Sequence, residues 1–170
     1  MTLILPLLFA CSGSPTPAPE DIVPEYTGTY RVVSYDEGAD CTADTPAEWG
    51  GTHAKIEVGS FFGIQTVDVY ICTSETECDT DFSEFFMEVV DETSASGSVE
   101  GWSVSGGICS MSWNQADLVM SSGGIEINAR TESNDDLVEA ADLDACEIAM
   151  ESYTGAVDCW SSERLVLEPI

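Results

Sequence analysis

The feature that most constrains this chain is an apolar side chain at every second position, repeated in short segments from Tyr26 to the C-terminus. In one such segment, Ile56 and Val58 are separated by Glu57. In a β-strand, successive side chains point to opposite faces, so a pattern that repeats every two residues lies on one face. An amphipathic helix instead repeats every 3.6 residues. Each segment therefore predicts an antiparallel strand with one buried and one solvated face. The apolar positions of these segments are Ala54, Ile56 and Val58; Val67, Val69 and Ile71; Phe85, Met87 and Val89; Cys109, Met111 and Trp113; Leu118 and Met120; Ile125, Ile127 and Ala129; Cys146, Ile148 and Met150; and Leu165 and Leu167.

Clusters of Gly, Ser and Asn separate these segments, and a first strand is expected near residues 29–35. The sequence thus predicts an all-β domain of about eight to ten antiparallel strands, joined as an up-and-down meander. A meander of this length needs to close or cover its edges, and a barrel is favoured over the alternative, a two-sheet β-sandwich. The longer interruption after Ser133 predicts one short helix near residues 134–143, with Leu137 and Ala141 on one face.

The first and last predicted strands carry a weak family pattern. Gly28-Thr29-Tyr30 opens the first strand, and Arg164 lies in the last. This pattern resembles that of lipocalins, which begin with Gly-x-Trp and carry a late arginine that packs on the tryptophan. The resemblance implies a lipocalin-like barrel in which Arg164 packs on Tyr30, although tyrosine here replaces tryptophan.

The N-terminus has the pattern of an export signal. Residues 1–10 are uncharged, and their apolar stretch Leu3–Ala10 has the length of a signal-peptide core. It is far shorter than the ~20 residues that span a bilayer. Leu8-Phe9-Ala10-Cys11 resembles the lipobox of bacterial lipoproteins, although Phe9 is bulky and no Lys or Arg precedes the core. The resemblance implies cleavage before Cys11 and its modification with a thioether-linked diacylglycerol and an amide-linked chain such as palmitate.

This interpretation divides the chain into three parts: a signal peptide at 1–10, a lipidated cysteine with a tether at 11–25, and a β domain at 26–170. The run Ser12–Pro19 contains only small residues and proline, so it behaves as a semi-rigid spacer rather than packing a core. The expected location is the cell envelope, anchored to the outer membrane and either periplasmic or surface-exposed. The lipid bilayer is then a partner through the acyl anchor.

Six cysteines remain after Cys11, and an exported chain meets an oxidising compartment. They are Cys41, Cys72, Cys78, Cys109, Cys146 and Cys159. The even number predicts three disulfides, although six cysteines allow 15 connectivities and the sequence does not choose among them. The expected bridges are Cys72–Cys78 across a local loop, Cys146–Cys159 within a late hairpin, and Cys41–Cys109 at long range. Zinc is disfavoured because the chain has one histidine and no Cys-x-x-Cys pair.

The charge excludes two classes of partner. The chain has 32 acidic and four basic residues, a net charge of −28 at pH 7. Nucleic acid would be repelled, and docking on anionic lipid through a basic patch is disfavoured. A solvated acidic surface is the simplest interpretation, and high salt is expected to stabilise the domain by screening its self-repulsion.

Calcium is the one cation that the acidic clusters suggest. The first cluster is Asp79-Thr80-Asp81 with Glu84, and the second is Asp142-Leu143-Asp144 with Glu147. Neither follows the EF-hand spacing, so acidic loop ends are the simpler interpretation. We therefore expect no metal site and no cofactor, with calcium as the alternative.

No catalytic pattern is present, so we expect no enzyme activity. Gly101-Trp102-Ser103-Val104-Ser105 misses the Gly-x-Ser-x-Gly nucleophile turn by one residue, and His53 is a lone histidine. The predicted function is a monomeric barrel that binds a small apolar ligand at the envelope; the alternative is a structural or interaction protein that acts through its acidic outer surface. The aromatic residues could line a ligand pocket or fill a core: Phe61, Phe62, Phe82, Phe85, Phe86, Trp102, Trp113 and Trp160.

Overall fold

The computed structural model describes residues 22–39, 49–139, 142–151 and 159–170. These residues form nine strands and one helix. The elements are β1 (Gly28–Ala39), β2 (His53–Phe61), β3 (Ile64–Ser74), β4 (Glu77–Cys78), β5 (Met87–Val89), β6 (Ser94–Ser105), β7 (Ile108–Ser121), β8 (Gly124–Glu139), α1 (Leu143–Glu151) and β9 (Cys159–Pro169).

The strands form one antiparallel sheet that closes on itself. Its order is β2-β1-β9-β8-β7-β6-β5-β3-β4, and β2 also pairs with β3. Eight strands therefore form a ring in chain order, while the two-residue β4 flanks β3 outside that ring. The predicted all-β, up-and-down antiparallel fold is confirmed. The two-sheet sandwich is not formed, because hydrogen bonds between β1 and β9 join the two ends of the meander.

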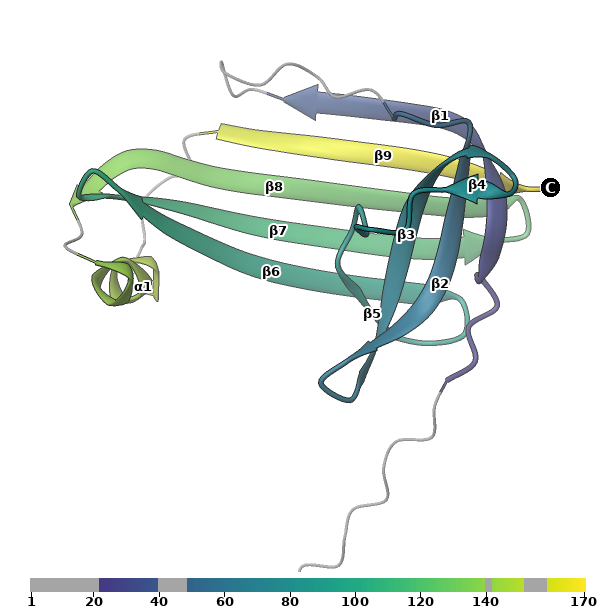
Figure 1. Ribbon diagram of the computed structural model, residues 1–170, viewed down its shortest axis with the longest axis horizontal. Helices are drawn as coiled ribbons and strands as arrows, with labels where there is room; N and C mark the ends of the chain where they lie inside the picture. The colour runs from purple at the N-terminus through teal and green to yellow at the C-terminus, as the bar shows by residue number, and fades with distance from the viewer. Residues whose placement is uncertain (1–21, 40–48, 140–141, 152–158) are drawn as a thin grey trace, which may run out of the picture.

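The ring is closed at one end and open at the other. In Figure 1, β2, β3 and the first part of β1 lie across the right-hand ends of the long strands β6–β9, and the rest of β1 runs beside β9. The left-hand ends of β6–β9 continue well beyond β2 and β3, and α1 lies beside them. The molecule thus combines a closed ring with a protruding four-stranded extension.

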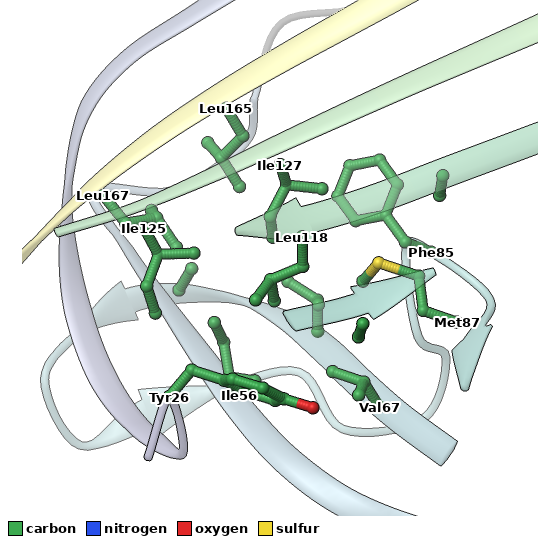
Figure 2. Close-up of a cluster of buried hydrophobic side chains, with 14 of the residues drawn as sticks. Tyr26, Ile56, Val67, Phe85, Met87, Leu118, Ile125, Ile127, Leu165 and Leu167 are labelled. Atoms are coloured by element: carbon green, nitrogen blue, oxygen red, sulfur yellow. The ribbon is translucent and has the colours of Figure 1, made fainter. Parts of the chain in front are cut away.

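The main core fills the closed end of the ring. Figure 2 shows side chains from opposite strands pointing toward one another there, among them Ile56, Leu118 and Leu165, all fully buried. These are the inward positions of the period-two pattern, and their neighbours carry the outward polar side chains. Burying one such side chain typically stabilises the fold by about 1.5–3 kcal/mol. The ring interior at this end is therefore packed rather than hollow.

The single helix lies later in the chain than expected. Residues 134–139, assigned above to a helix, continue β8, where Asn134 pairs with Met111 of β7. The segment around Cys146 and Met150, assigned to a strand, is α1. Cys146 and Met150 are spaced by four and buried on one helix face, whereas Ile148 between them is 65% exposed. Ser133 and Asn134 could cap a helix, but both residues pair with β7 instead. Hydrogen bonds to a neighbouring strand outweigh the local preference for a helix start.

Asp142 supplies the N-cap that starts α1. Its Oδ1 accepts a hydrogen bond from the backbone N–H of Ala145 at 2.9 Å, and its carbonyl accepts one from Cys146 at 3.1 Å. Ala145, Ala149 and Met150 of the helix then pack around Met111 of β7. Met111 and Leu118 are seven positions apart, an odd number, so they face opposite sides of the sheet. The helix therefore covers the outer face of the extension and leaves the inner face open.

Two disulfides are formed among the described residues. Cys72–Cys78 ties β4 to β3 and confirms the predicted local bridge. Cys109–Cys146 fastens α1 to β7 across 37 residues. This bridge shows that the predicted pairs Cys146–Cys159 and Cys41–Cys109 are wrong. Because Cys146 is helical, it faces the strand beneath it rather than a hairpin partner.

The covalent partner of Cys159 gives a direct test of the N-terminal interpretation. Cys159 is disulfide-bonded, and its partner lies outside the described residues, where Cys41 and Cys11 are located. An acylated Cys11 has no free thiol, so we expect a non-reduced proteolytic digest to contain a peptide linking Cys159 to Cys41. Tandem mass spectrometry of that digest is the measurement. A Cys159–Cys11 peptide would contradict lipidation.

Arg164 does not take the place that the lipocalin resemblance implied. Its guanidinium donates to both carboxylate oxygens of Glu126, at 3.1 and 2.8 Å, on the solvated face. These hydrogen bonds lower the pKa of Glu126 to about 2. Tyr30 is instead 6% exposed in the core, and its strand partner in β9 is Pro169. The expected packing of Arg164 on Tyr30 is therefore wrong.

Candidate functional site

Strand register arranges the inner face of the long strands in layers. In the layer nearest the core, Ala95, Leu118, Ile127, Leu165 and Tyr35 are successive cross-strand neighbours from β6 to β1. The next layer toward the open end is Gly97, Ala116, Ala129, Glu163 and Glu37. Three members of this second layer are small, and the other two are glutamates. The packed core therefore ends at a layer that leaves space above it.

Gly97 is needed for the shape of this layer. A Cβ placed on Gly97 would lie 2.4 Å from the carbonyl oxygen of Phe86 and 2.9 Å from Cα of Met87. The absent side chain lets the segment before β5 approach β6 closely. That approach brings Glu84 and Phe85 over the inner face, opposite Glu163.

A third layer, with two polar side chains and one apolar one, completes the floor. Val99, Asn114 and Thr131 are cross-strand neighbours in β6, β7 and β8. The Thr131 hydroxyl donates to Oδ1 of Asn114 at 2.8 Å, and the Asn114 amide donates to the Val99 carbonyl at 3.3 Å. These contacts fix both side chains across the strands.

Together these layers surround a cavity of about 310 Å³ at the open end of the ring. This size is at the lower end of the range for small-molecule sites. The cavity is lined by Ser83, Glu84, Phe85, Phe86, Val99, Asn114, Gln115, Ala116, Ala129, Arg130, Thr131 and Glu163. Its walls combine apolar carbons with two carboxylates, two side-chain amides, two hydroxyls and the guanidinium of Arg130, which is paired with Glu132, so the interior is amphipathic rather than purely apolar.

Three carboxylates gather around Glu163, which lines this cavity, and we call them together with two aromatic neighbours the acidic mouth: Tyr35, Glu37, Trp49, Glu84 and Glu163. Glu37 and Glu163 are direct cross-strand partners in β1 and β9. Like charges at directly opposite positions repel, and that repulsion is screened less where water is partly excluded. The fold therefore holds a concentration of negative charge at one point of its inner face.

Burial and mutual repulsion shift the titration of this group. Burial raises the pKa of Glu163, and the charges of Glu37 and Glu84 raise it further, against a lowering hydrogen bond from Tyr35. Burial, followed by the Asp79 charge, raises the pKa of Glu84. The pKa of the Tyr35 hydroxyl is raised by burial and by the neighbouring carboxylates. In each case burial is the larger cause, and the neighbouring carboxylates add to it.

An aromatic wall borders the carboxylates. The Trp49 ring stacks on Phe85 at 6.5 Å between centroids, with an interplanar angle of 6°. Tyr35 packs against the same indole at 5.8 Å. Within the described part of the chain, the buried atoms Nε1 of Trp49 and Oε2 of Glu37 have no hydrogen-bond partner. A donor and an acceptor are thus both available beside the aromatic wall.

The predicted aromatic residues are placed very differently from one another. Phe85 is 6% exposed in the core, and Phe86 lines the cavity. Phe61, Phe62 and Phe82 are instead exposed, and none of the three belongs to the core or lines this cavity. On the extension, Trp102 is exposed, whereas Trp113 and Trp160 are partly buried.

The candidate calcium ligands have local roles in the structure. Asp79 Oδ1 accepts a hydrogen bond from the Asp81 backbone at 3.1 Å, and Asp142 caps α1. In the four ranges that the structure describes, no three His, Cys, Asp or Glu side chains are grouped so that they could hold a metal ion.

Cys11 and Cys41 lie outside the described residues, as do the predicted signal peptide and most of the predicted tether. The described chain starts at Ile22, and residues 22–25 are already hydrogen-bonded to the domain. Within the described ranges, α1 is a nine-residue helix, and no helix there has the length and apolar character that crossing a membrane requires.

The acidic mouth was not predicted from the sequence, although the sequence contains one signal for it. Leu167 and Leu165 are inward positions of the last strand. The next position in this series, two residues earlier, is Glu163, which therefore lies on the inner face. A carboxylate at an inward position indicates a functional site more often than an outward one does, because burying it is unfavourable. The contributions of Trp49 and Glu84 to the acidic mouth could not be predicted from the sequence, since both residues lie in irregular segments. No family model, curated protein or solved structure matches this chain.

Proposed function

We propose that this protein is a lipid-anchored envelope protein whose β domain binds a small amphipathic ligand with an apolar body and a cationic group. The observation that carries the proposal is the cavity in which Glu84 and Glu163 face an aromatic and aliphatic wall. Envelope anchoring rests on the lipobox-like Cys11 and the spacer that follows it. Ligand binding rests on the acidic mouth.

The cationic group follows from electrostatics. A protonated amine between Glu37 and Glu163 would relieve the repulsion of this directly opposed pair. The aromatic face of Trp49 offers a further favourable contact to a cation or to an apolar chain. An anionic ligand would add a further negative charge beside Glu163, next to the carboxylates of Glu37 and Glu84. The proposed ligand is therefore amphipathic, in contrast to the purely apolar one expected from the sequence.

Acidic pH is expected to weaken binding. The pKa of Glu163 is raised, so its carboxylate is neutralised at a higher pH than an exposed glutamate. As pH falls through that raised pKa, the cation loses its partner and its affinity decreases.

Replacing Glu163 by glutamine is expected to have opposite effects on binding and on stability. Because the folded-state pKa is raised, the unfolded chain loses this proton at a lower pH than the folded chain does. Stability is therefore lost as pH rises through the raised pKa, and Glu163→Gln removes this penalty at neutral pH. We expect a gain of about 0.2–1 kcal/mol, the scale of a cross-strand pair. Glu147→Gln on the exposed face of α1 is the matched control for charge.

The ligand class is tested by isothermal titration calorimetry with octylammonium and with octanoate. We expect octylammonium to bind, octanoate not to bind, and Glu163→Gln to weaken octylammonium binding by roughly tenfold, as for a lost charged contact. Glu147→Gln should leave the affinity unchanged. Equal binding of both probes, or of neither, would contradict a cation site. The function would then be sought on the outer surface of the domain, as in the structural or interaction alternative.

A further inference from the structure

The hairpin between β2 and β3 ends in exposed apolar side chains. Phe61 is 56% exposed, Phe62 92% and Ile64 47%. We call these three residues the apolar tip. Phe61 contacts Phe62 edge-on at 4.5 Å and Phe86 at 6.4 Å between ring centroids, so the tip forms one continuous patch with its neighbour. Large apolar side chains gathered on a surface indicate an interaction site more often than scattered ones do.

The conformation of the turn is unusual for the residue it carries. The hairpin is closed by Phe62 and Gly63, both with positive φ, 48° and 83°. Such two-residue turns favour Asn-Gly or Gly-Gly, because a bulky residue is strained in the left-handed region. Phe62 gains no burial that would offset this strain within the domain. The phenylalanine at this position is therefore better explained by a contact outside the domain than by folding.

The tip is also uncharged in a highly charged protein. No Asp, Glu, Lys or Arg occurs from Val58 to Val67, although the chain has 32 acidic residues. The first charges are Glu57 and Asp68, which are cross-strand partners at the base of this hairpin. An uncharged, aromatic end above an acidic base is the arrangement expected of a segment that enters a bilayer interface.

The N-terminal segment leaves the domain at the same place. The backbone N–H of Ile22 donates to Oε1 of Gln65, and the Gln65 amide donates to the Ile22 carbonyl, both at 2.9 Å. Gln65 directly follows Ile64 of the tip. Figure 1 shows the start of the described chain and the β2–β3 hairpin on the same lower side of the molecule. Val23, beside this exit, is 81% exposed and adds to the apolar surface.

We propose that the apolar tip inserts into the headgroup–acyl boundary of the bilayer that holds the acylated Cys11. This inference rests on the lipid anchor proposed above. The eleven residues from Cys11 to Ile22 reach at most about 36–40 Å, so the anchor keeps the domain near the membrane. Because the exit point is hydrogen-bonded beside the tip, pulling on the tether turns the tip toward the lipid.

The charge of the protein selects the kind of surface. A net charge of −28 opposes approach to anionic headgroups, so the expected partner is a zwitterionic bilayer. Insertion of the tip depends on apolar contact rather than on charge, which the uncharged run from Val58 to Val67 permits. Tip insertion would also fix which side of the domain faces the membrane.

The test uses the full mature protein in phosphatidylcholine vesicles that contain lipids brominated near the headgroup. A tryptophan is introduced as Phe62→Trp, and Leu143→Trp on α1, which is also exposed, is the matched control. The parent protein corrects for the native tryptophans. We expect the added fluorescence of Phe62→Trp to be quenched at least about threefold more than that of Leu143→Trp, since interfacial side chains enter the acyl boundary. Vesicles with anionic lipid should reduce this difference.

Intact mass spectrometry of the same sample separates failure of the anchor from failure of the tip. If Cys11 is unmodified, the lipoprotein proposal fails. The thiol of Cys11 is then coupled to a maleimide phospholipid, so that the quenching is still measured at the same tether length. Equal quenching of the two variants in either form would overturn the tip proposal. Sedimentation of the unanchored chain gives a second way to overturn the proposal. A dimer that dissociates on Phe62→Ser substitution would show that the tip binds a second copy of the chain.

Discussion

Replacement of Cys11 by serine is expected to release the protein from the membrane fraction almost completely. The hydroxyl of serine cannot form the thioether that would carry the diacylglycerol. Each acyl methylene buried in a bilayer contributes about 0.8 kcal/mol, so loss of two or three chains removes the whole anchor. The apolar tip has only three exposed side chains, which are too few to hold the domain in place of that anchor.

The measurement is the distribution of the protein between membrane and soluble fractions after carbonate extraction, together with the intact mass. Ser12→Ala is the matched control, because it changes the adjacent residue and leaves the thiol. An uncleaved precursor is still expected to be extractable, since Leu3–Ala10 is too short to span a bilayer. A Cys11→Ser protein that stays in the membrane fraction would show that another feature anchors it.

The alternation of apolar residues was sufficient to predict the class of the fold. Ile56, Leu118 and Leu165 are fully buried at inward positions of the pattern. Such a pattern fixes which face of each strand is buried, because a shift of one residue would expose every apolar side chain. Short connections then favour pairing between neighbours in the chain, and eight of the nine strands form the ring in that order.

The helix was misplaced because short segments carry both periodicities. Cys146 and Met150 satisfy a spacing of four as well as a spacing of two, and Ile148 between them favoured the strand interpretation. The cap at Asp142 decides for the helix, through its hydrogen bond to Ala145. An acidic residue just before an apolar segment is a signal that could have moved the prediction to the correct place.

The cysteine connectivity could not be predicted for a related reason. Cys109 and Cys146 are 37 residues apart, and their contact depends on α1 folding back over the outer face of β7. The local bridge Cys72–Cys78 was predictable, since its six-residue separation fits a hairpin. Long-range pairs follow from tertiary topology, which cysteine spacing alone does not contain.

The candidate site depends on side chains that no local pattern brings together. Glu163 and Glu37 meet because β9 and β1 close the ring, so their pairing is a consequence of closure rather than of either segment. Trp49 and Phe85 stack although they come from different irregular segments. The small residues Gly97, Ala116 and Ala129 share one layer only after the register of three strands is known.

Replacement of Gly124 by alanine is expected to destabilise the domain by at least about 2–3 kcal/mol, the upper range for a strained backbone position. Gly124 has φ +137°, in the region that residues with a Cβ rarely adopt. A Cβ would lie 2.0 Å from the carbonyl oxygen of Leu167, which is backbone and cannot move aside without breaking the β8–β9 ladder. That ladder is one of the pairings that close the ring.

Gly123, the preceding residue, provides a matched control for this substitution. Its Cβ would meet only the Ser121 hydroxyl at 3.9 Å, an ordinary contact distance. Gly123→Ala should therefore change stability by no more than about 0.5–1 kcal/mol. Urea denaturation of the full mature chain, followed by tryptophan fluorescence, measures both variants. We expect Gly124→Ala to unfold at a clearly lower urea concentration than Gly123→Ala. Coincident unfolding curves would mean that β8 and β9 are not held together as closely as ring closure requires.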